Sequence, residues 1–402
     1  MLGLTRSAAR GYSLRIAQAT PDTRDRAIDG LRAAAILGVV GGHWLVTALT
    51  VRSDGSLRID SPLRYLGGFA PASWLFETLG LFFLVGGFAA AKSLERHGPD
   101  TGAWVRRRMA RLLTPVLAAT VALAAALPAA SLAGVAGGTL RTWTVLFVQP
   151  LWFIAVYAAV TALTPFAMRL DDRLGAWAAL PFLAAVAAVD LIRYGPWAAG
   201  APGWVGFLTV LPAWLFMYQL GVAWARGRLG RRAAAWLVAG GAALFAVLVG
   251  ALDYPASMVG VPGAARSNSS PPSLLVPALA AVQAGAALLV RDRLDGLLRR
   301  RPALWAAVAT VNLYALAIFC WHLTAVVLMS LGAQQLGGVA GLTTRPDTAT
   351  WVGARLVWLP LLGLVLVGLV ALAGRLERLT SAHRVLAGVA AAGFTAYALA
   401  VY

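Results

Sequence analysis

Long runs of apolar residues, separated by short polar or charged segments, dominate the pattern along the chain. Eleven of these runs are long enough, or nearly long enough, to cross about 30 Å of hydrocarbon as helices. They cover residues 31–50, 70–91, 112–134, 143–167, 174–192, 204–225, 233–252, 273–290, 303–332, 351–373 and 385–402. The runs are too continuous for barrel strands, which leaves helices as the spanning elements. The pattern predicts an all-α, polytopic transmembrane bundle of about ten or eleven spanning helices. The count is ten if the short last run forms a peripheral helix instead of crossing the membrane.

The composition agrees with a single membrane domain. Of the 402 residues, 60% are hydrophobic and only 12% are charged, whereas soluble proteins carry about 25% charged residues. No polar stretch is long enough for a second domain, so we expect a basic tail at 1–29 and an integral membrane domain at 30–402. The arginine-rich tail matches either a transit peptide or a disordered basic end, and we favour the second.

The net charge of +18 raises the question of nucleic-acid binding, but its distribution argues for topology instead. If residue 1 lies inside, 25 of the 34 lysines and arginines fall in alternate segments that are then all cytoplasmic. This alternation follows the positive-inside rule. The sequence therefore predicts a cytoplasmic N-terminus and a lipid bilayer, not a nucleic acid, as the partner of this charge.

The first apolar run contains two residues that are unfavourable in hydrocarbon, Arg32 and His43. Eleven helical residues advance only about 20° past three full turns and rise roughly 16 Å, so both side chains lie on one helix face. An ionisable residue inside a spanning helix is a functional candidate by default. Arg32 alone also fits a snorkelling anchor at a helix end, whereas His43 lies too deep to reach water and accepts a proton near neutral pH.

Few other ionisable groups lie at membrane depth. Glu77 and His322 are the main ones, and for each the simplest interpretation is a hydrogen bond between helices. We favour that interpretation for Asn312. Glu77 either orients His43, which we favour, or is a neutral structural acid, and His322 is a second histidine that is either structural or a partner of His43. The only cysteine, Cys320, lies in an apolar run, so neither a disulfide nor a metal site is expected.

The strongest basic cluster contains Arg106, Arg107, Arg108 and Arg111. Topology explains part of this cluster. However, Arg108 and Arg111 are three residues apart and share a helix face, and planar guanidinium groups bind phosphates with two parallel hydrogen bonds. The cluster is therefore a candidate site for the phosphates of a nucleotide-bearing donor.

At these residues the chain resembles the membrane acyltransferase-3 family. The motifs that carry the resemblance are Arg32-x10-His43, Phe82-Phe-Leu-Val-Gly-Gly-Phe88, Arg108-x-x-Arg111 with Pro115, Leu151-Trp-Phe-Ile-Ala-Val-Tyr157 and Trp321-His322. Gly42-His43-Trp44 and Ser267-Asn268-x-x-Pro271-Pro272 are similar to actinobacterial members. The chain departs from the family at Gly86, where a serine is usual.

The resemblance implies a multi-pass acyltransferase of the bacterial inner membrane that uses cytoplasmic acyl-CoA as a substrate and no bound cofactor. The acyl group, often acetyl, goes to a hydroxyl of a sugar, glycan, lipid or secondary metabolite. His43 is then the essential histidine and Arg32 its partner, while the arginine pair binds the donor. Trp152 and Tyr157, in the fourth motif, are expected to contact substrate.

These inferences combine into one mechanism. The phosphates of CoA would bind at the arginine cluster, and His43 would either take a proton from the acceptor hydroxyl or carry the acyl group. Arg32 would stabilise the donor or a developing oxyanion. The main alternative is a secondary transporter or exporter that uses the intramembrane His, Glu and Arg residues as a proton relay, although no internal repeat supports it. A scaffold that has kept the fold without activity is a third possibility.

Overall fold

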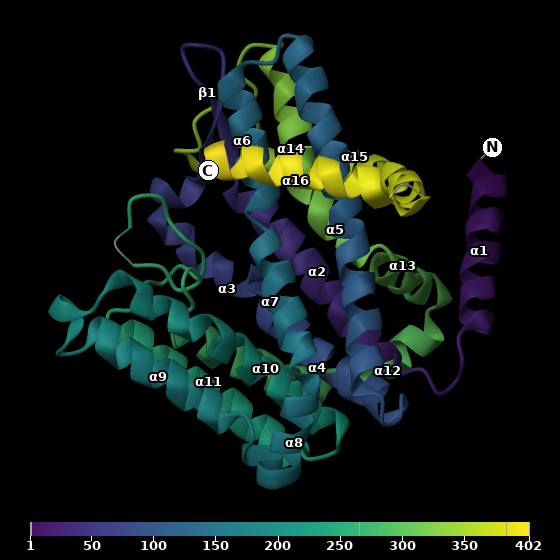
Figure 1. The fold of residues 1–402 in the computed structure, drawn as a ribbon, viewed down its shortest axis with the longest axis vertical. Helices are drawn as coiled ribbons and strands as arrows, with labels where there is room; N and C mark the ends of the chain where they lie inside the picture. Colours follow the sequence, from purple (N-terminus) through teal and green to yellow (C-terminus); the bar gives the residue numbers. More distant parts are fainter. Residues whose placement is uncertain (1, 265, 383, 402) are drawn as a thin grey trace.

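Helices make up nearly all of the regular structure in the computed structural model, which describes the backbone of residues 2–264, 266–382 and 384–401 (Figure 1). Side chains are described for residues 11–264, 266–375, 377 and 388–400. The helices are α1 (Leu2–Ala19), α2 (Arg26–Val46), α3 (Ser73–Phe76), α4 (Leu79–Glu95), α5 (Thr101–Leu132), α6 (Gly137–Val148), α7 (Leu151–Ala162), α8 (Thr164–Leu174), α9 (Leu180–Tyr194), α10 (Val210–Ala225), α11 (Arg231–Ala251), α12 (Leu275–Arg300), α13 (Pro302–Leu313), α14 (Ala315–Gln334), α15 (Ala349–Ala382) and α16 (Arg384–Val401). The expected polytopic helical bundle is confirmed.

Within the described residues, eight helical segments are long and apolar enough to cross a membrane. They are Gly67–Glu95, Thr101–Leu132, Gly137–Ala162, Gly203–Ala225, Arg231–Ala251, Leu275–Arg300, Ala315–Gln334 and Ala349–Arg375. The pair Thr164–Trp177 and Leu180–Tyr194, bent by 87°, would make a ninth if it forms one broken span. This number is lower than the ten or eleven expected from the apolar runs.

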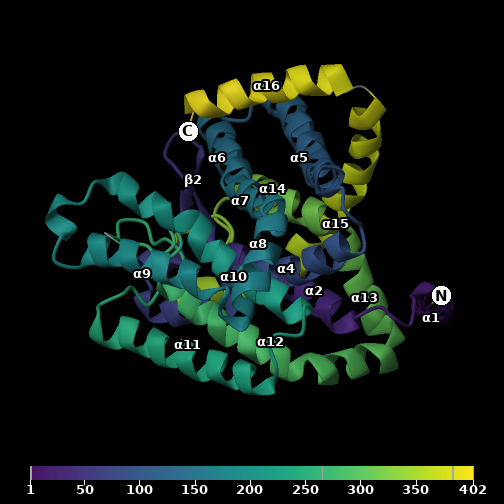
Figure 2. The ribbon, with the colours of Figure 1, turned by 60° about the horizontal axis from the view of Figure 1, so that its bottom comes forward.

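The difference comes from three of the runs. The run at 31–50 forms α2, whose charged residues and histidine keep it out of the eight apolar segments. The run at 174–192 forms part of the bent pair Thr164–Trp177 and Leu180–Tyr194, which is not counted among the eight. The last run forms α16, which crosses α5 and α6 instead of running alongside them (Figures 1 and 2). The alternative of a peripheral last helix is thus the one that fits the structure.

The tail at 1–29 also differs from the expected disordered end. It forms α1, which packs against α13 at the margin of the bundle (Figure 1). The indole Nε1 of Trp305 donates to Thr20 Oγ1 at 2.9 Å, and the Arg26 guanidinium lies 4.9 Å from the centre of the Trp305 ring. These contacts hold the segment between α1 and α2 against the bundle.

Glycines allow α4 and α10 to pack with their backbones in contact. A Cβ atom at Gly221 would lie 1.9 Å from the carbonyl oxygen of Leu84, and one at Gly87 would lie 2.1 Å from that of Tyr218. Small residues at such an interface are typical of membrane helix pairs. Because α2 contacts α4, α12, α13 and α14, the helix lies near the centre of the bundle (Figure 2).

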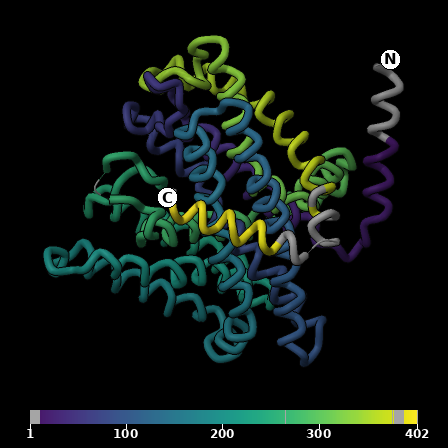
Figure 3. The backbone as a smooth tube through the Cα atoms, turned by 45° about the horizontal axis from the view of Figure 1, so that its top comes forward, coloured from purple at the N-terminus to yellow at the C-terminus, as the bar shows by residue number. Residues whose placement is uncertain are grey.

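A short antiparallel hairpin, β1 (Ala48–Val51) and β2 (Leu57–Asp60), follows α2 directly. It lies beside the segment after α14, as Figure 3 shows at the top of the molecule. Gln334 Nε2 donates to the carbonyl oxygen of Gly55 at 2.5 Å, and the Arg345 guanidinium lies 4.7 Å from the centre of the Tyr65 ring. The hairpin therefore covers the end of the bundle at which α2 ends.

Candidate functional site

Helix α2 carries both Arg32 and His43. The helix begins after Asp25, whose carboxylate accepts from the backbone N–H of Ile28 at 3.2 Å, and it ends where the N–H of Thr47 donates to the carbonyl oxygen of His43 at 2.9 Å. A single unbroken helix therefore separates the two side chains by about 16 Å along its axis. The structure places them on one helix, as expected, but in two different cavities.

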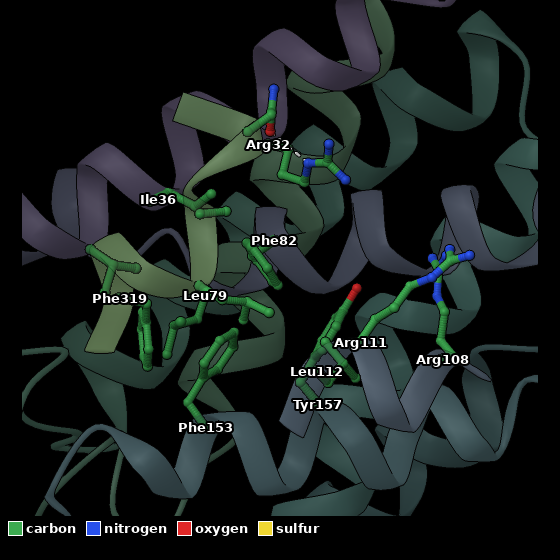
Figure 4. A pocket seen from close by; sticks show the side chains of 14 residues that line it. Arg32, Ile36, Leu79, Phe82, Arg108, Arg111, Leu112, Phe153, Tyr157 and Phe319 are labelled. Atoms are coloured by element: carbon green, nitrogen blue, oxygen red, sulfur yellow. Dashed lines mark hydrogen bonds between the residues drawn. The ribbon is translucent and has the colours of Figure 1, made fainter. Parts of the chain in front are cut away.

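The first of these, which we call the arginine cavity, has a volume of about 200 Å³. It is lined by Arg32, Ile36, Val39, Leu79, Phe82, Arg108, Arg111, Leu112, Phe153, Tyr157, Asn312, Ala315, Leu316 and Phe319. Figure 4 shows Arg108 and Arg111 on one side of this space and the aromatic rings of Phe153 and Phe319 on the other. The cavity thus has a cationic side and an apolar side.

Hydrogen bonds hold the Arg32 side chain in the arginine cavity. Its Nε donates to Asn312 Oδ1 at 2.6 Å, and its Nη2 donates to Asp29 Oδ1 at 3.1 Å. Asn312 Nδ2 in turn donates to the carbonyl oxygen of Asp29 at 2.8 Å. The helix–helix hydrogen bond expected for Asn312 is confirmed, and it also orients Arg32, a role that sequence reasoning missed.

The Asp29 carboxylate serves a second arginine. Arg24, in the segment between α1 and α2, donates from Nε to Asp29 Oδ2 at 2.6 Å. This hydrogen bond raises the pKa of Arg24 above its ordinary value. One carboxylate therefore pairs with two guanidinium groups, which leaves a net positive charge on this cluster. That charge favours the binding of an anion beside Arg32.

The four arginines of the basic cluster on α5 divide into two pairs. Arg108 and Arg111 line the arginine cavity, whereas Arg106 and Arg107 are exposed and line none of the cavities described here. Arg107 lies against His97 in the α4–α5 connection, with Nη2 at 3.3 Å from Nδ1. The four arginines therefore do not share one site, contrary to the expectation. Only Arg108 and Arg111 remain candidates for the arginine cavity.

The two aromatic candidates, Tyr157 and Trp152, also lie in different places. Tyr157 lines the arginine cavity, and its hydroxyl points into the same space as Arg32 (Figure 4). Trp152 is 40% exposed and packs near Trp214, with ring centres 5.9 Å apart, outside that cavity. A Cβ atom at Gly86 would lie 2.8 Å from the Tyr157 ring, so a glycine at this position leaves room for the tyrosine.

A larger charged space lies next to the arginine cavity. This charged vestibule has a volume of about 900 Å³ and is lined by Pro21, Thr23, Arg24, Asp25, Ile28, Asp29, Arg32, Phe88, Ala89, Lys92, Ser93, Arg96, Arg108, Arg291, Asp292, Asp295 and Arg299. Arg32 and Arg108 line both spaces. They therefore stand at the boundary between the vestibule and the arginine cavity.

His43 lies in a separate space, which we call the histidine cavity, with a volume of about 280 Å³. It is lined by Val39, Gly42, His43, Leu45, Val46, Pro62, Leu63, Phe69, Ala72, Ser73, Phe76, Glu77, Leu79, Val259, Val352 and Leu356. Val39 and Leu79 line the arginine cavity as well. The charged vestibule, the arginine cavity and the histidine cavity thus adjoin one another in that order.

His43 is paired with His322 of α14. His43 Nδ1 lies 2.7 Å from His322 Nε2, and the ring planes are within 17° of parallel with their centres 5.0 Å apart. On its other side, His322 Nδ1 lies 2.7 Å from the carbonyl oxygen of Phe319. Trp44 Nε1 donates to the carbonyl oxygen of His322 at 2.8 Å, which further fixes α14 against α2.

Glu77 lines the histidine cavity but is not the hydrogen-bond partner of the His43 ring. It lies in the break between α3 and α4, where its carbonyl oxygen accepts from Gln283 Nε2 at 2.7 Å. Its side-chain Oε1 is buried and has no hydrogen-bond partner among the described residues. The expected contact that orients His43 is therefore made by His322 instead.

Among the described residues, no group of three or more His, Cys, Asp or Glu side chains is arranged to hold a metal ion. The site instead combines three guanidinium groups, one histidine pair and two cavities with largely apolar walls. Such a site can bind an anionic molecule at one end and remove a proton at the other.

The fold and this site define a multi-pass membrane acyltransferase, because the model of an acyltransferase domain matches residues 25–376. The chain belongs to the acyltransferase-3 family. No curated protein and no solved structure matched the chain. The family match does not favour the alternative of a transporter or exporter.

Proposed function

We propose that this acyltransferase moves an acyl group from acyl-CoA to a hydroxyl of its acceptor, with His43 as the general base. The observation that supports this proposal is the order of the three adjoining spaces. Arg32 and Arg108 line both the charged vestibule and the arginine cavity, and Val39 and Leu79 line both that cavity and the histidine cavity. A donor bound at the arginines would thus extend toward the histidine pair, from which Val39 and Leu79 separate it.

The donor half of the site is suited to CoA. Arg32, Arg108 and Arg111 present guanidinium groups that can each bind a phosphate with parallel hydrogen bonds. The wide vestibule suits the nucleotide, and the narrower arginine cavity suits the thin arm that carries the thioester. Because Arg32 lines a different cavity from His43, its proposed role is donor binding and not stabilisation of an oxyanion beside the histidine.

The hydrogen bonds of the histidine pair assign the proton positions when both rings are neutral. The carbonyl oxygen of Phe319 can only accept a hydrogen bond, so His322 Nδ1 must carry a proton and donate it to that oxygen. His322 Nε2 is then an acceptor, and His43 Nδ1 must donate to it. This leaves the lone pair of His43 on Nε2, which is the nitrogen that acts as the base.

The proposed reaction balances through that nitrogen. His43 Nε2 takes the proton of the acceptor hydroxyl while the oxygen attacks the thioester carbonyl carbon. The tetrahedral intermediate collapses, the carbon–sulfur bond breaks, and the proton passes from His43 to the leaving CoA sulfur. If His43 carries the acyl group instead, the same Nε2 attacks the thioester carbonyl carbon, the carbon–sulfur bond breaks and CoA leaves as its thiolate, so an acyl-enzyme accumulates when no acceptor is present.

His43→Ala tests this function. The variant should retain its place in the membrane and its folding, yet lose at least about a hundredfold in acyl transfer, since general base catalysis contributes about 10²–10⁴ in rate. The measurement is transfer from radiolabelled acetyl-CoA by purified protein in nanodiscs. His97→Ala is the matched control, because His97 lines none of the three spaces. Full activity in His43→Ala would remove this histidine from the mechanism.

A further inference from the structure

The polar groups of the histidine cavity are few. Among the side chains that line it, only those of Ser73, His43 and Glu77 are polar. The hydroxyl of Ser73 is already used, because it donates to the carbonyl oxygen of Ala70 at 2.6 Å and accepts from the backbone N–H of Met258 at 2.9 Å. Only His43 and Glu77 therefore have side-chain groups available to a bound molecule.

The rest of the wall is made of aliphatic and aromatic side chains, including Phe69, Phe76 and Leu356. No lysine, arginine, asparagine or glutamine is among the residues that line this space. A sugar ring would bring several hydroxyls into the cavity, and each hydroxyl left unpaired there would weaken binding. The wall thus selects against carbohydrate and for a molecule with a large apolar surface.

Glu77 adds a second requirement. Its Oε1 is buried without a hydrogen-bond partner among the described residues, and buried polar groups are usually paired. Because Glu77 and His43 line the same cavity, a molecule that donates one hydrogen bond to His43 and one to Glu77, whose side chain would turn toward it, would pair both groups.

We propose that the acceptor is a compact, largely apolar alcohol whose reacting hydroxyl donates to His43 and whose second hydrogen-bond donor pairs with Glu77. The inference rests on the proposed function, and it narrows the acceptor from any hydroxyl compound to an amphiphile with two adjacent donors. A cavity volume of about 280 Å³ limits the part of the molecule that is enclosed. Glu77 is then a specificity residue, and its oxygen takes no part in breaking or forming bonds.

Three acceptors of graded polarity test this with acetyl-CoA and protein in nanodiscs: 1,2-octanediol, 1-octanol and glucose. We expect kcat/KM to be about tenfold higher for the diol than for the mono-alcohol, the effect of pairing one buried acceptor, and no transfer to glucose. Glu77→Leu should remove the preference for the diol while 1-octanol is still acetylated. Transfer to glucose at a comparable rate, or a diol preference that survives in Glu77→Leu, would overturn the inference.

A binding measurement separates this inference from the proposed function. The His43→Ala variant is irradiated with a diazirine-bearing 1,2-diol, and the adducts are mapped by mass spectrometry. We expect adducts on the α15 wall of the cavity at Val352 and Leu356. They should be lost in Leu356→Trp, which fills the space, and kept in Leu364→Trp, whose position on α15 is exposed. Adducts on this wall combined with no transfer to any acceptor by the wild-type protein would refute the proposed function alone, whereas absence of adducts from this wall would refute the acceptor class.

Discussion

At the scale of single residues, the contact between His43 and His322 determines which nitrogen of His43 would act as the base in the proposed mechanism. The two residues are 279 positions apart, and their hydrogen bond depends on how α14 packs against α2. His322 touches no acceptor in the proposed mechanism, since it does not line the histidine cavity. In the proposed mechanism it is therefore a positioning residue that would hold the proton on His43 Nδ1.

His322→Ala should therefore change the tautomer of His43 as well as the rate. Without an acceptor at Nδ1, the neutral His43 ring is free to carry its proton on Nε2, and we expect kcat to fall by about 10–100-fold, as when an orienting partner of a histidine is removed. The measurement combines acetyl transfer with ¹⁵N NMR of labelled histidine, which distinguishes the two tautomers. His322→Gln is the control, because its amide oxygen can still accept. A lowered rate with an unchanged tautomer would assign His322 a purely structural role.

The sequence predicted part of this arrangement, for reasons that are physical. Helical spacing alone placed Arg32 and His43 on one face of one helix. It could not show that Val39 and Leu79 divide that face between two cavities, because Leu79 belongs to another helix. The sequence left the partner of His43 open between Glu77 and His322 for the same reason, because residue type favours a carboxylate whereas tertiary packing supplies His322.

At the scale of helices, hydropathy identified the bundle but not how each apolar run is used. The run at 303–332 is apolar throughout, yet α13 ends at Leu313 and α14 begins at Ala315. The run that forms α16 lies across α5 and α6 because it packs there, with Phe394 buried at 6% exposure and its ring centre 5.8 Å from that of Phe147 on α6. Length and composition do not specify the angle between helices, which depends on the partner surface.

The first turns of α5 give a prediction at this scale, because one helix presents two arginines to the arginine cavity and two away from it. Arg108→Ala combined with Arg111→Ala should raise the apparent KM for acetyl-CoA by at least about tenfold, since hydrogen bonds to charged groups contribute about 1.5–3 kcal/mol each. The measurement is initial-rate kinetics at saturating acceptor.

Arg106→Ala combined with Arg107→Ala provides the matched control on the same helix. It removes the same charge from exposed positions that line no cavity described here, so it should change KM by less than about threefold. Equal effects of the two double variants would mean that the whole basic cluster acts through its net charge and membrane topology.

At the scale of the whole molecule, the proposed path has a direction that the distribution of charge predicts. The charged vestibule and the Arg108–Arg111 pair lie at the end of the bundle where the positive-inside rule places the cytoplasm, which is where CoA is found. The β1–β2 hairpin follows the other end of α2. The donor would therefore enter from the cytoplasm, and the histidine cavity would lie closer to the opposite surface.

Cysteine labelling in intact cells tests this direction. Cys320 is the single cysteine of the chain and is buried. Labelling of a variant can therefore be assigned to the one exposed cysteine that was introduced. Ser53→Cys, in the hairpin, should react with a membrane-impermeant maleimide from outside, whereas Thr101→Cys, at the start of α5, should react only after the membrane is permeabilised. The reversed pattern would place Arg108 and Arg111 on the surface away from CoA. Donor binding at those arginines would then be impossible in the cell, even if His43 remained essential, because the thioester would have no route to the arginine cavity.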